Sequence, residues 1–292
     1  MSKNYRAELT GVFGDPVDGN PTGVMEEAAY EACGLNYRYL TLKVTREDFA
    51  DAMKAIRAFH MKGMNLTMPH KIRVLPYLDE ISEAASIIGA VNTIVVKEDG
   101  KLFGENTDGK GFVQALKNQG VSLEEKNVVI LGAGGAARAI AVECALFGAS
   151  KVKIVNRTPA RAQELADALV AHTQAEASCE AWNGSFEVPE DTDILINATS
   201  IGLHPDSDKK PDIAYDTITE KMVVSDVVFN PCDTLFLREA KKRGARTVNG
   251  LGMLACQGAL NFTLWTGVEA PLQVIRSSSS CTRGCPGRRR RT

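Results

Sequence analysis

The sequence predicts an α/β protein with two domains. Short apolar runs rich in β-branched residues alternate with longer segments of helical pattern along most of the chain. This alternation is typical of helices packed on a mostly parallel sheet. It occurs on both sides of residue 107, so we expect an N-terminal α/β layer followed by a second, separate one.

The composition excludes several classes of protein. The chain of 292 residues is 44% hydrophobic and 24% charged, with a net charge of −2, which offers no basic face for nucleic acid. No apolar run approaches the ~20 residues needed to span a membrane. The N-terminus lacks the apolar segment of a signal peptide, so the expected location is the cytoplasm. No cluster of cysteines and histidines has the spacing of a zinc site, and no metal is expected.

The first part of the chain contains four predicted strands and four predicted helices. The strands are residues 6–13, 37–44, 64–68 and 90–96, and the helices are residues 24–33, 46–59, 71–78 and 81–88. Two polar stretches follow strands, N-L-T-M-P-H-K at 65–71 and N-T-D-G at 106–109. We interpret the second as a turn before a helix that begins near residue 112.

Residues 127–158 form a βαβ unit. It consists of a strand at 128–131, the turn G-A-G-G-A-A at 132–137, an alanine-rich helix ending at Gly148, and a second strand at 152–155. Gly132 permits a tight turn, and Gly134 lets the backbone approach a pyrophosphate at the helix N-terminus. Ala137 takes the third small position, where helix and strand pack closely. The unit therefore predicts a Rossmann-type dinucleotide-binding domain.

The end of the second strand of this unit selects the cofactor. Chains that bind NAD usually have Asp or Glu there, for the ribose 2′-hydroxyl. This chain has Asn156, Arg157 and Thr158 instead. A guanidinium pairs with a 2′-phosphate, whereas a carboxylate would repel it. The sequence therefore predicts NADP(H) as the cofactor.

The alternation continues after residue 158. Strands are expected at 192–197, 222–228 and 247–250, and helices at 160–172, 234–243, 254–265 and from 271 onward. Residues 277–292, with four serines and four arginines in runs, have no periodicity and no core-forming residues. We interpret them as a disordered or non-native tail.

A nicotinamide cofactor moves a hydride, and the substrate then needs a group that supplies or removes a proton. The two polar stretches of the first domain contain a lysine and an aspartate, each after a strand, where α/β sheets place ligand sites. A carboxylate can orient a lysine that transfers the proton. Lys71 and Asp108 are therefore the candidate catalytic pair.

Seven motifs in order resemble the shikimate dehydrogenase family. They are N-L-T-M-P-H-K, G-A-V-N-T at 89–93, G-E-N-T-D-G at 104–109, G-A-G-G-A-A, N-R-T, N-A-T-S-I-G at 197–202 and N-G-L-G-M-L-A-C-Q-G at 249–258. The following N-F-T-L-W-T-G at 261–267 is most similar to the quinate/shikimate branch. The resemblance covers roughly residues 6–276 and implies reversible reduction of 3-dehydroshikimate to shikimate with NADPH.

The resemblance also implies roles for individual residues. Lys71 would be the acid/base and Asp108 its partner. The remaining substrate contacts would be Asn20, Thr22, Thr67, Asn92, Phe229 and Gln257. The cofactor contacts would be Gly132, Ala133, Gly134, Gly135, Ala136, Asn156, Arg157, Thr158, Thr199, Ile201, Val227 and Gly250. The expected domains are residues 1–107 for substrate, 108–245 for NADP, and 246–276 as C-terminal helices returning to the substrate domain.

The chain departs from the family pattern in the substrate site. Where the family commonly has Ser-x-Ser to grip the substrate carboxylate, this chain has Asn20, Pro21 and Thr22. Asn20 can donate and Thr22 keeps a hydroxyl, but Pro21 stiffens the loop and lacks a backbone donor. A common tyrosine is replaced by Phe229, which removes one polar contact. The reaction class is unaffected by these changes, but the substrate is left open.

Three functions are therefore weighed. The first is an NADP-dependent shikimate dehydrogenase. The second is the same chemistry on quinate or a related hydroxylated ring carboxylate, which Asn20 and Thr22 favour. The third is an NADP-binding regulator without catalysis, against which the intact Lys71 and Asp108 argue. The expected partners are the small-molecule substrate and cofactor, without nucleic acid or membrane, and a homodimer is left open.

Overall fold

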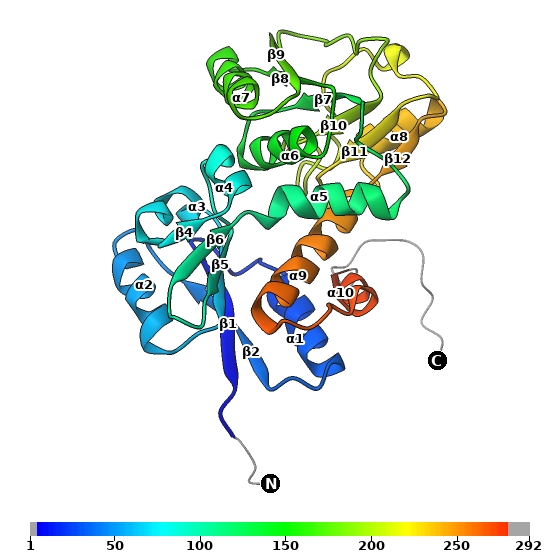
Figure 1. The fold of residues 1–292 in the computed structure, drawn as a ribbon. Helices are drawn as coiled ribbons and strands as arrows, with labels where there is room; N and C mark the ends of the chain where they lie inside the picture. The colour runs from blue at the N-terminus through cyan, green and yellow to red at the C-terminus, as the bar shows by residue number, and fades with distance from the viewer. Residues whose placement is uncertain (1–4, 280–292) are drawn as a thin grey trace, which may run out of the picture. The chain divides into compact units, whose positions relative to one another are not determined.

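The computed structural model describes residues 5–279 and divides the chain into two compact units, whose elements are labelled in Figure 1. Unit 1 contains the residues up to Gly111 and those from Ala255 to Ser279, and unit 2 runs from Phe112 to Leu254. The boundaries fall inside helices α5 (Thr107–Asn118) and α9 (Gly250–Thr266). Each unit has its own six-stranded sheet, so the predicted two-domain α/β class is confirmed.

The sheet of unit 1 is mixed and has the strand order β2-β1-β3-β5-β6-β4. Its strands are β1 (Glu8–Gly14), β2 (Tyr37–Lys43), β3 (Gly63–Leu66), β4 (Glu80–Ile81), β5 (Thr93–Val96) and β6 (Leu102–Glu105). β1 is parallel to β2 and β3, whereas β5 is antiparallel to both β3 and β6. The end of β3, the start of β5 and the end of β6 therefore lie at one edge of the sheet.

Helices from both ends of the chain complete unit 1. They are α1 (Thr22–Ala32), α2 (Phe49–Ala58), α3 (His70–Arg73), the 3₁₀ turn η1 (Leu75–Tyr77), α4 (Glu83–Ile88) and α10 (Leu272–Ser279), together with the start of α5 and most of α9. α10 packs against α1, as Figure 1 shows, although they are far apart in sequence. One side of the sheet buries a core that includes Phe13, Ile56 and Met64. Burial of such side chains stabilises the fold by about 1.5–3 kcal/mol each.

The sheet of unit 2 is entirely parallel and has the order β12-β11-β10-β7-β8-β9. Its strands are β7 (Asn127–Leu131), β8 (Lys151–Asn156), β9 (Glu176–Ala181), β10 (Ile194–Asn197), β11 (Val223–Asp226) and β12 (Arg246–Val248). The central pair, β7 and β10, marks the point where the strand order reverses. In a doubly wound sheet, ligands bind at the carboxyl ends of these strands.

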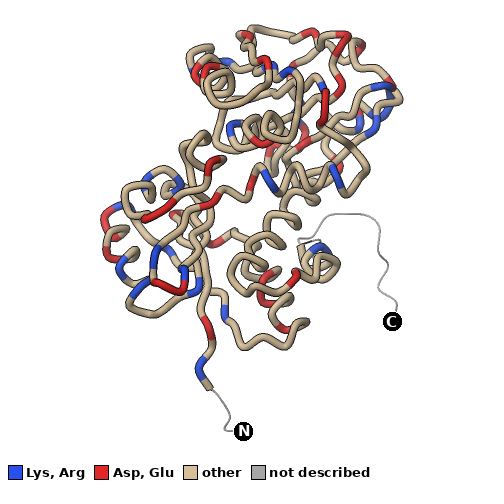
Figure 2. The backbone as a smooth tube through the Cα atoms, in the orientation of Figure 1, with Lys and Arg blue, Asp and Glu red and all other residues tan. Residues whose placement is uncertain are grey.

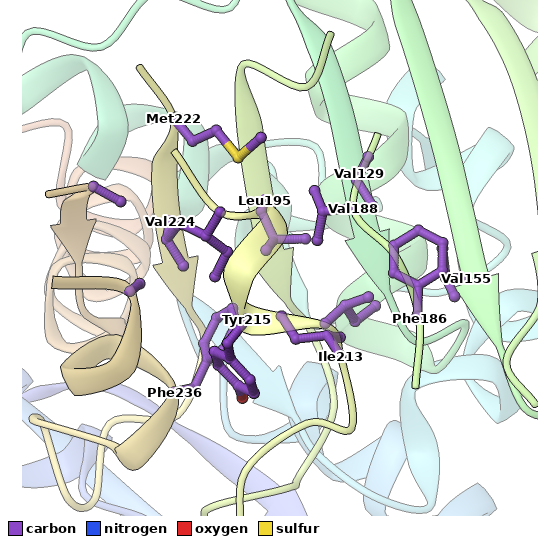
Figure 3. Packing of buried hydrophobic residues seen from close by; sticks show 14 of the residues in the cluster. Val129, Val155, Phe186, Val188, Leu195, Ile213, Tyr215, Met222, Val224 and Phe236 are labelled. Carbon is purple, nitrogen blue, oxygen red and sulfur yellow. The ribbon is translucent and has the colours of Figure 1, made fainter. Parts of the chain in front are cut away.

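Helices cover the parallel sheet of unit 2. α6 (Gly135–Leu146) packs on β7 and β8, α7 (Pro159–His172) on β8 and β9, and α8 (Leu235–Lys242) on β11 and β12. A further 3₁₀ turn is η2 (Tyr215–Thr217). Figure 3 shows Leu195 and Val224 from neighbouring strands packed with Tyr215 and Phe236. Because covered parallel strands are buried on both faces, β10 is an uninterrupted apolar run before its final residue.

Several predicted elements need correction. Residues 107–109 of the N-T-D-G stretch lie in the first turn of α5, so Asp108 lies on a helix rather than in a free turn. The helix expected at 71–78 is divided into α3 and η1, and Pro76 lies in the second piece. Strands β4, β6 and β9 were not predicted, and β4 ends at Ile81, where the helix at 81–88 was expected to begin. β9 is a polar edge strand, E-A-S-C-E-A, and lacks the apolar pattern by which buried strands are found.

The unit boundaries also differ from those expected. β12 hydrogen-bonds to β11, so residues 246–248 belong to unit 2 rather than to the returning segment. At the other end, α10 continues to Ser279, so the segment expected to be a tail begins with three helical residues, 277–279. The rest of that segment, residues 280–292, lies outside the described residues.

Charge distribution, membrane-spanning potential and possible metal ligands are three further features of the described residues. Figure 2 shows acidic and basic residues intermixed along the chain. Within residues 5–279, no helix is long and apolar enough to cross a membrane. In the same range, no three His, Cys, Asp or Glu side chains are grouped so that they could hold a metal ion.

Candidate active site

Lys71 and Asp108 form an ion pair in unit 1. Lys71 lies on α3, just after β3, and Asp108 lies in the first turn of α5, just after β6. The distance from Lys71 Nζ to Asp108 Oδ2 is 2.6 Å. The side chains are 32% and 16% exposed, respectively, so the pair is partly shielded but still reachable by a ligand. The two candidates named from separate motifs therefore lie in direct contact.

Asn92 fixes the second oxygen of the aspartate. Its Nδ2 donates to Asp108 Oδ1 over 2.9 Å, and its Oδ1 accepts from the backbone N–H of Thr107 over 2.8 Å. Asn92 immediately precedes β5, whose antiparallel register with β3 and β6 brings it to this edge. Both oxygens of the Asp108 carboxylate are therefore engaged. The fixed carboxylate in turn orients the Lys71 ammonium.

A buried polar network supports this arrangement from within unit 1. Asn261 on α9 accepts from the Thr93 and Thr107 hydroxyls over 2.8 and 2.9 Å, and both hydroxyls also contact Asn92. Asn65 donates to Thr93 Oγ1 over 3.0 Å, and its Oδ1 accepts from the Tyr39 hydroxyl. Burial raises the pKa of that phenol well above its usual value. A buried network of paired polar groups favours one orientation of each side chain, so it supports the position of Asn92 beside Asp108.

The other substrate candidates of unit 1 lie on three elements. Thr67 follows β3, and its N–H donates to Phe13 O over 3.0 Å. Asn20 Oδ1 accepts from the N–H of Thr22 over 2.9 Å, which fixes the loop that leads into α1. Gln257 lies on α9 against Gly111, where an added Cβ would be 2.8 Å from the Gln257 nitrogen. Among the described residues, no hydrogen bond links Asn20, Thr22 or Gln257 to the ion pair.

The glycine-rich turn of unit 2 has the geometry expected for a phosphate site. Gly132 has φ +112°, which favours glycine, and its N–H donates to Val155 O over 2.7 Å. Ala133 and Gly134 follow, and α6 begins at Gly135 without a side-chain cap. A Cβ at Gly134 would meet no atom within 4 Å. The first N–H groups of α6 are therefore open to an anion, and the turn fits a pyrophosphate.

The residues after β8 border a cavity in unit 2. Asn156 Nδ2 donates to Thr158 O over 3.0 Å and closes the turn that carries Arg157. Arg157 lines a cavity of about 530 Å³ together with Trp182, Gly184, Ser200, Ile201, Asp206, Lys209, Lys210 and Asp212. This volume is within the range of small-molecule sites. An exposed guanidinium at its border can pair with a 2′-phosphate, as the sequence predicts.

Two further loops at the carboxyl edge of this sheet carry the remaining cofactor candidates. Thr199 and Ile201 follow β10, and the Thr199 hydroxyl accepts from the N–H of Ile201 over 3.1 Å. Val227 follows β11, and Gly250 begins α9 beside it. A Cβ at Gly250 would lie 2.4 Å from Val227 O, so only glycine fits there. Phe229 is also in this unit, and its contact with substrate stays a prediction.

Comparison with known proteins identifies the family. The model for the shikimate dehydrogenase substrate binding domain matches residues 12–94, and that for shikimate / quinate 5-dehydrogenase matches residues 114–228. The model for the shikimate 5'-dehydrogenase C-terminal domain matches residues 250–278. The shikimate dehydrogenase (NADP(+)) of Desulforamulus reducens is 42% identical over 277 residues, covering 94% of this chain and 95% of that protein. This chain belongs to the shikimate dehydrogenase family.

Solved structures agree with this membership. The ligand-free 5-ketofructose reductase of a Gluconobacter species is 46% identical, with a TM-score of 0.92 and coverage of 95% of this chain and 99% of that one. The shikimate 5-dehydrogenase of Thermus thermophilus, in complex with NADP(H) and shikimate, is 36% identical, with a TM-score of 0.81 and coverage of 94% and 99%. Solved structures that share this fold therefore include proteins whose names give different substrates.

Sequence reasoning missed the residues that support the ion pair. Tyr39, Asn65, Thr93, Thr107 and Asn261 were not named as site residues, although several of them lie inside motifs that were. The available signal was the position of Asn65 within a buried strand and of Thr107 shortly after another. For Asn261, nothing in the sequence indicates that a residue 154 positions after Thr107 binds its hydroxyl.

Proposed function

We propose that this chain is an NADP-dependent dehydrogenase that interconverts 3-dehydroshikimate and shikimate. The observation that supports this most directly is the Lys71–Asp108 pair, 2.6 Å apart, in a chain of this family. Arg157 beside a cavity in unit 2 supports the choice of NADP(H) over NAD(H). Thr67, Asn92 and Gln257 would bind the substrate hydroxyls.

The reaction needs one hydride and one proton. NADPH, when bound, supplies the hydride to the carbonyl carbon. Lys71, as an ammonium, donates a proton to the carbonyl oxygen and later regains one from solvent. Asp108 stabilises the ammonium and, held by Asn92, keeps it directed at one point. A positioned acid of this kind contributes about 10²–10⁴-fold to a rate.

Replacement of Lys71 tests the proposal. Lys71→Ala should lower kcat for shikimate oxidation by at least about 100-fold, because the proton-transfer group is lost. NADPH binding, measured by fluorescence titration, should stay unchanged, since the cofactor candidates lie on unit 2. Lys54→Ala, at an exposed lysine on α2, is the matched control. Unchanged turnover in Lys71→Ala would remove the assignment of the pair.

A neutral ketone is a second candidate substrate. The loop that would grip a carboxylate has Asn20, Pro21 and Thr22 in place of Ser-x-Ser, and the side-chain oxygen of Asn20 is already engaged with the Thr22 N–H. The Gluconobacter enzyme of 46% identity is a 5-ketofructose reductase, whose substrate has no carboxylate. These two observations favour a hydroxylated ketone without a negative charge as the alternative.

Steady-state rates with shikimate, quinate and 5-ketofructose, each with NADP(H) and NAD(H), separate these alternatives. The highest kcat/KM with shikimate supports the main proposal, a preference for quinate supports the ring-carboxylate alternative, and a preference for 5-ketofructose supports the neutral ketone. NADPH binding without turnover of any substrate would support the third alternative, an NADP-binding regulator without catalysis. The homodimer and the cytoplasmic location stay predictions, and light scattering tests the first.

A further inference from the structure

A buried carboxylate joins two strand ends in unit 2. Asp226 ends β11 and is 1% exposed, and Asn197 ends β10 and is fully buried. The two are register partners, and Asn197 Nδ2 donates to Asp226 Oδ1 over 3.0 Å. The aspartate also accepts from the Thr234 hydroxyl over 2.7 Å and from the N–H of Val228 over 3.0 Å. Each oxygen of this carboxylate is therefore engaged.

Asn197 holds the loop that follows β10. Its Oδ1 accepts from the Thr199 hydroxyl over 2.7 Å, and its Nδ2 donates to Ile201 O over 3.2 Å. The amide thus contacts the loop at two points and Asp226 at a third. Removing its acidic partner would leave one of the two Nδ2 hydrogens without an acceptor and would hold the amide by the loop alone, so the amide and the loop would both become less fixed.

Asp226 holds the loop that follows its own strand. Its bond to the Val228 N–H fixes the backbone just after Val227, and its bond to Thr234 reaches the residue that caps α8. A single carboxylate therefore connects the loop after β10, the loop after β11 and the start of α8.

A contribution to folding stability does not by itself explain this buried carboxylate. Burial raises the pKa of Asp226 to about 6, which reflects the loss of solvation by the charged form. Buried ionised groups are often no more stabilising than apolar groups of similar volume. What the carboxylate provides, and an apolar side chain cannot, is three directed hydrogen bonds to backbone and side-chain donors.

We propose that Asp226, acting through Asn197, is a positioning residue that holds the loops after β10 and β11 against the nicotinamide half of the cofactor. The inference rests on the proposed function, in which Thr199, Ile201 and Val227 line that half. Asp226 does not touch the cofactor itself in this scheme. Arg157 and the glycine-rich turn, to which the adenosine half is assigned, share no hydrogen bond with Asp226 or Asn197 among the described residues, and only Ser200 and Ile201 of the loop after β10 border the cavity beside Arg157.

The test compares NADPH with 2′,5′-ADP, which has the phosphorylated adenosine half but no nicotinamide. In Asp226→Ala, the Kd for NADPH should rise about tenfold, and the Kd for 2′,5′-ADP should change less than about twofold. Asp226→Asn should show a smaller but still selective rise, about threefold, because its carbonyl oxygen can accept from Asn197 and Val228. Isothermal titration measures all four constants without any substrate.

Ser225→Ala is the matched control, since Ser225 is equally buried on β11 and its Oγ has no hydrogen-bond partner among the described residues. Both Kd values should stay at their wild-type levels. Equal weakening of the two ligands by the Asp226 variants, or unchanged NADPH binding, would overturn this inference alone. If Asp226→Ala does not fold, Asp226→Asn decides by the same criterion. A wild-type chain that binds neither ligand would overturn the proposed cofactor, and this inference with it.

Discussion

At the scale of single residues, buried polar groups in this chain divide into satisfied and unsatisfied ones. Asn92 and Asn261 have several partners each, which is the usual state of buried amides. Glu26 on α1 is different: it is fully buried, and neither carboxylate oxygen has a hydrogen-bond partner among the described residues. Burial raises the pKa of Glu26 well above its usual value. The charged form is therefore destabilising.

Glu26→Gln should stabilise the protein in a pH-dependent way. Below the unfolded pKa, both states hold a neutral Glu26 and the wild type has no disadvantage. As pH rises, the Glu26 carboxyl ionises in the unfolded chain but stays protonated in the folded protein. Ionisation therefore stabilises the unfolded state, and the wild type loses stability. The variant should exceed the wild type by about 1–3 kcal/mol at pH 7.5 and by little at pH 4.5. Urea unfolding at both pH values measures this, and Glu31→Gln, exposed on the same helix, is the control.

At the scale of elements, the βαβ unit was the part most readily predicted. The strands at 128–131 and 152–155 agree with β7 and β8 to within one residue at each end. The agreement arises because apolar runs, a glycine-rich turn and an alanine-rich helix all indicate the same structure. β4, β6 and β9 were missed, since the first two are short and the third is polar. The hydrogen-bond partners of the Asn261 and Asp226 side chains could not be predicted, because these residues meet their partners only in the folded chain.

Two glycines at the carboxyl edge of the sheet of unit 2 should respond differently to substitution. Gly134→Ala meets no atom of the protein, so the melting temperature should stay within about 2 °C, but the methyl group would occupy the space proposed for the pyrophosphate. Its Kd for NADPH should rise at least about tenfold. Gly250→Ala would collide with Val227 O, and we expect a loss of about 1–3 kcal/mol in stability.

Thermal unfolding and fluorescence titration of the two variants check this contrast. A Gly134→Ala protein that binds NADPH normally would argue against the turn as the phosphate site. A Gly250→Ala protein of wild-type stability would show that the backbone at Val227 moves aside at little cost.

At the scale of the whole molecule, the proposed work is divided between the two units. The acid/base pair and its network belong to unit 1, and the glycine-rich turn and Arg157 belong to unit 2. Each unit has a separate sheet and core, so cofactor and substrate should each protect backbone amides in a different unit. The division also explains why the sequence indicated the reaction class better than the substrate: short motifs carry the cofactor site, whereas the substrate loop is the part that departs from the family.

Hydrogen exchange should separate the two binding events. NADPH should slow exchange in peptides that contain residues 132–137 and 199–201, because their N–H groups become covered. Shikimate should slow exchange mainly in peptides that contain Asn92 and Thr107. NADH is the control for the first effect and should protect the peptide with Arg157 less. Protection of the Asn92 peptide by NADPH alone would contradict this division.

The interruption of unit 1 has a consequence for synthesis of the protein. Residues 112–254 form one uninterrupted segment, whereas unit 1 needs residues 255–279, which leave the ribosome later. Asn261 and Trp265, which bonds to Ile94 O, are in this late segment. Because domains generally fold as units as they emerge, the nascent chain can complete unit 2 while its earlier residues still lack their final helices. The acid/base centre is then the last part of the enzyme to be completed.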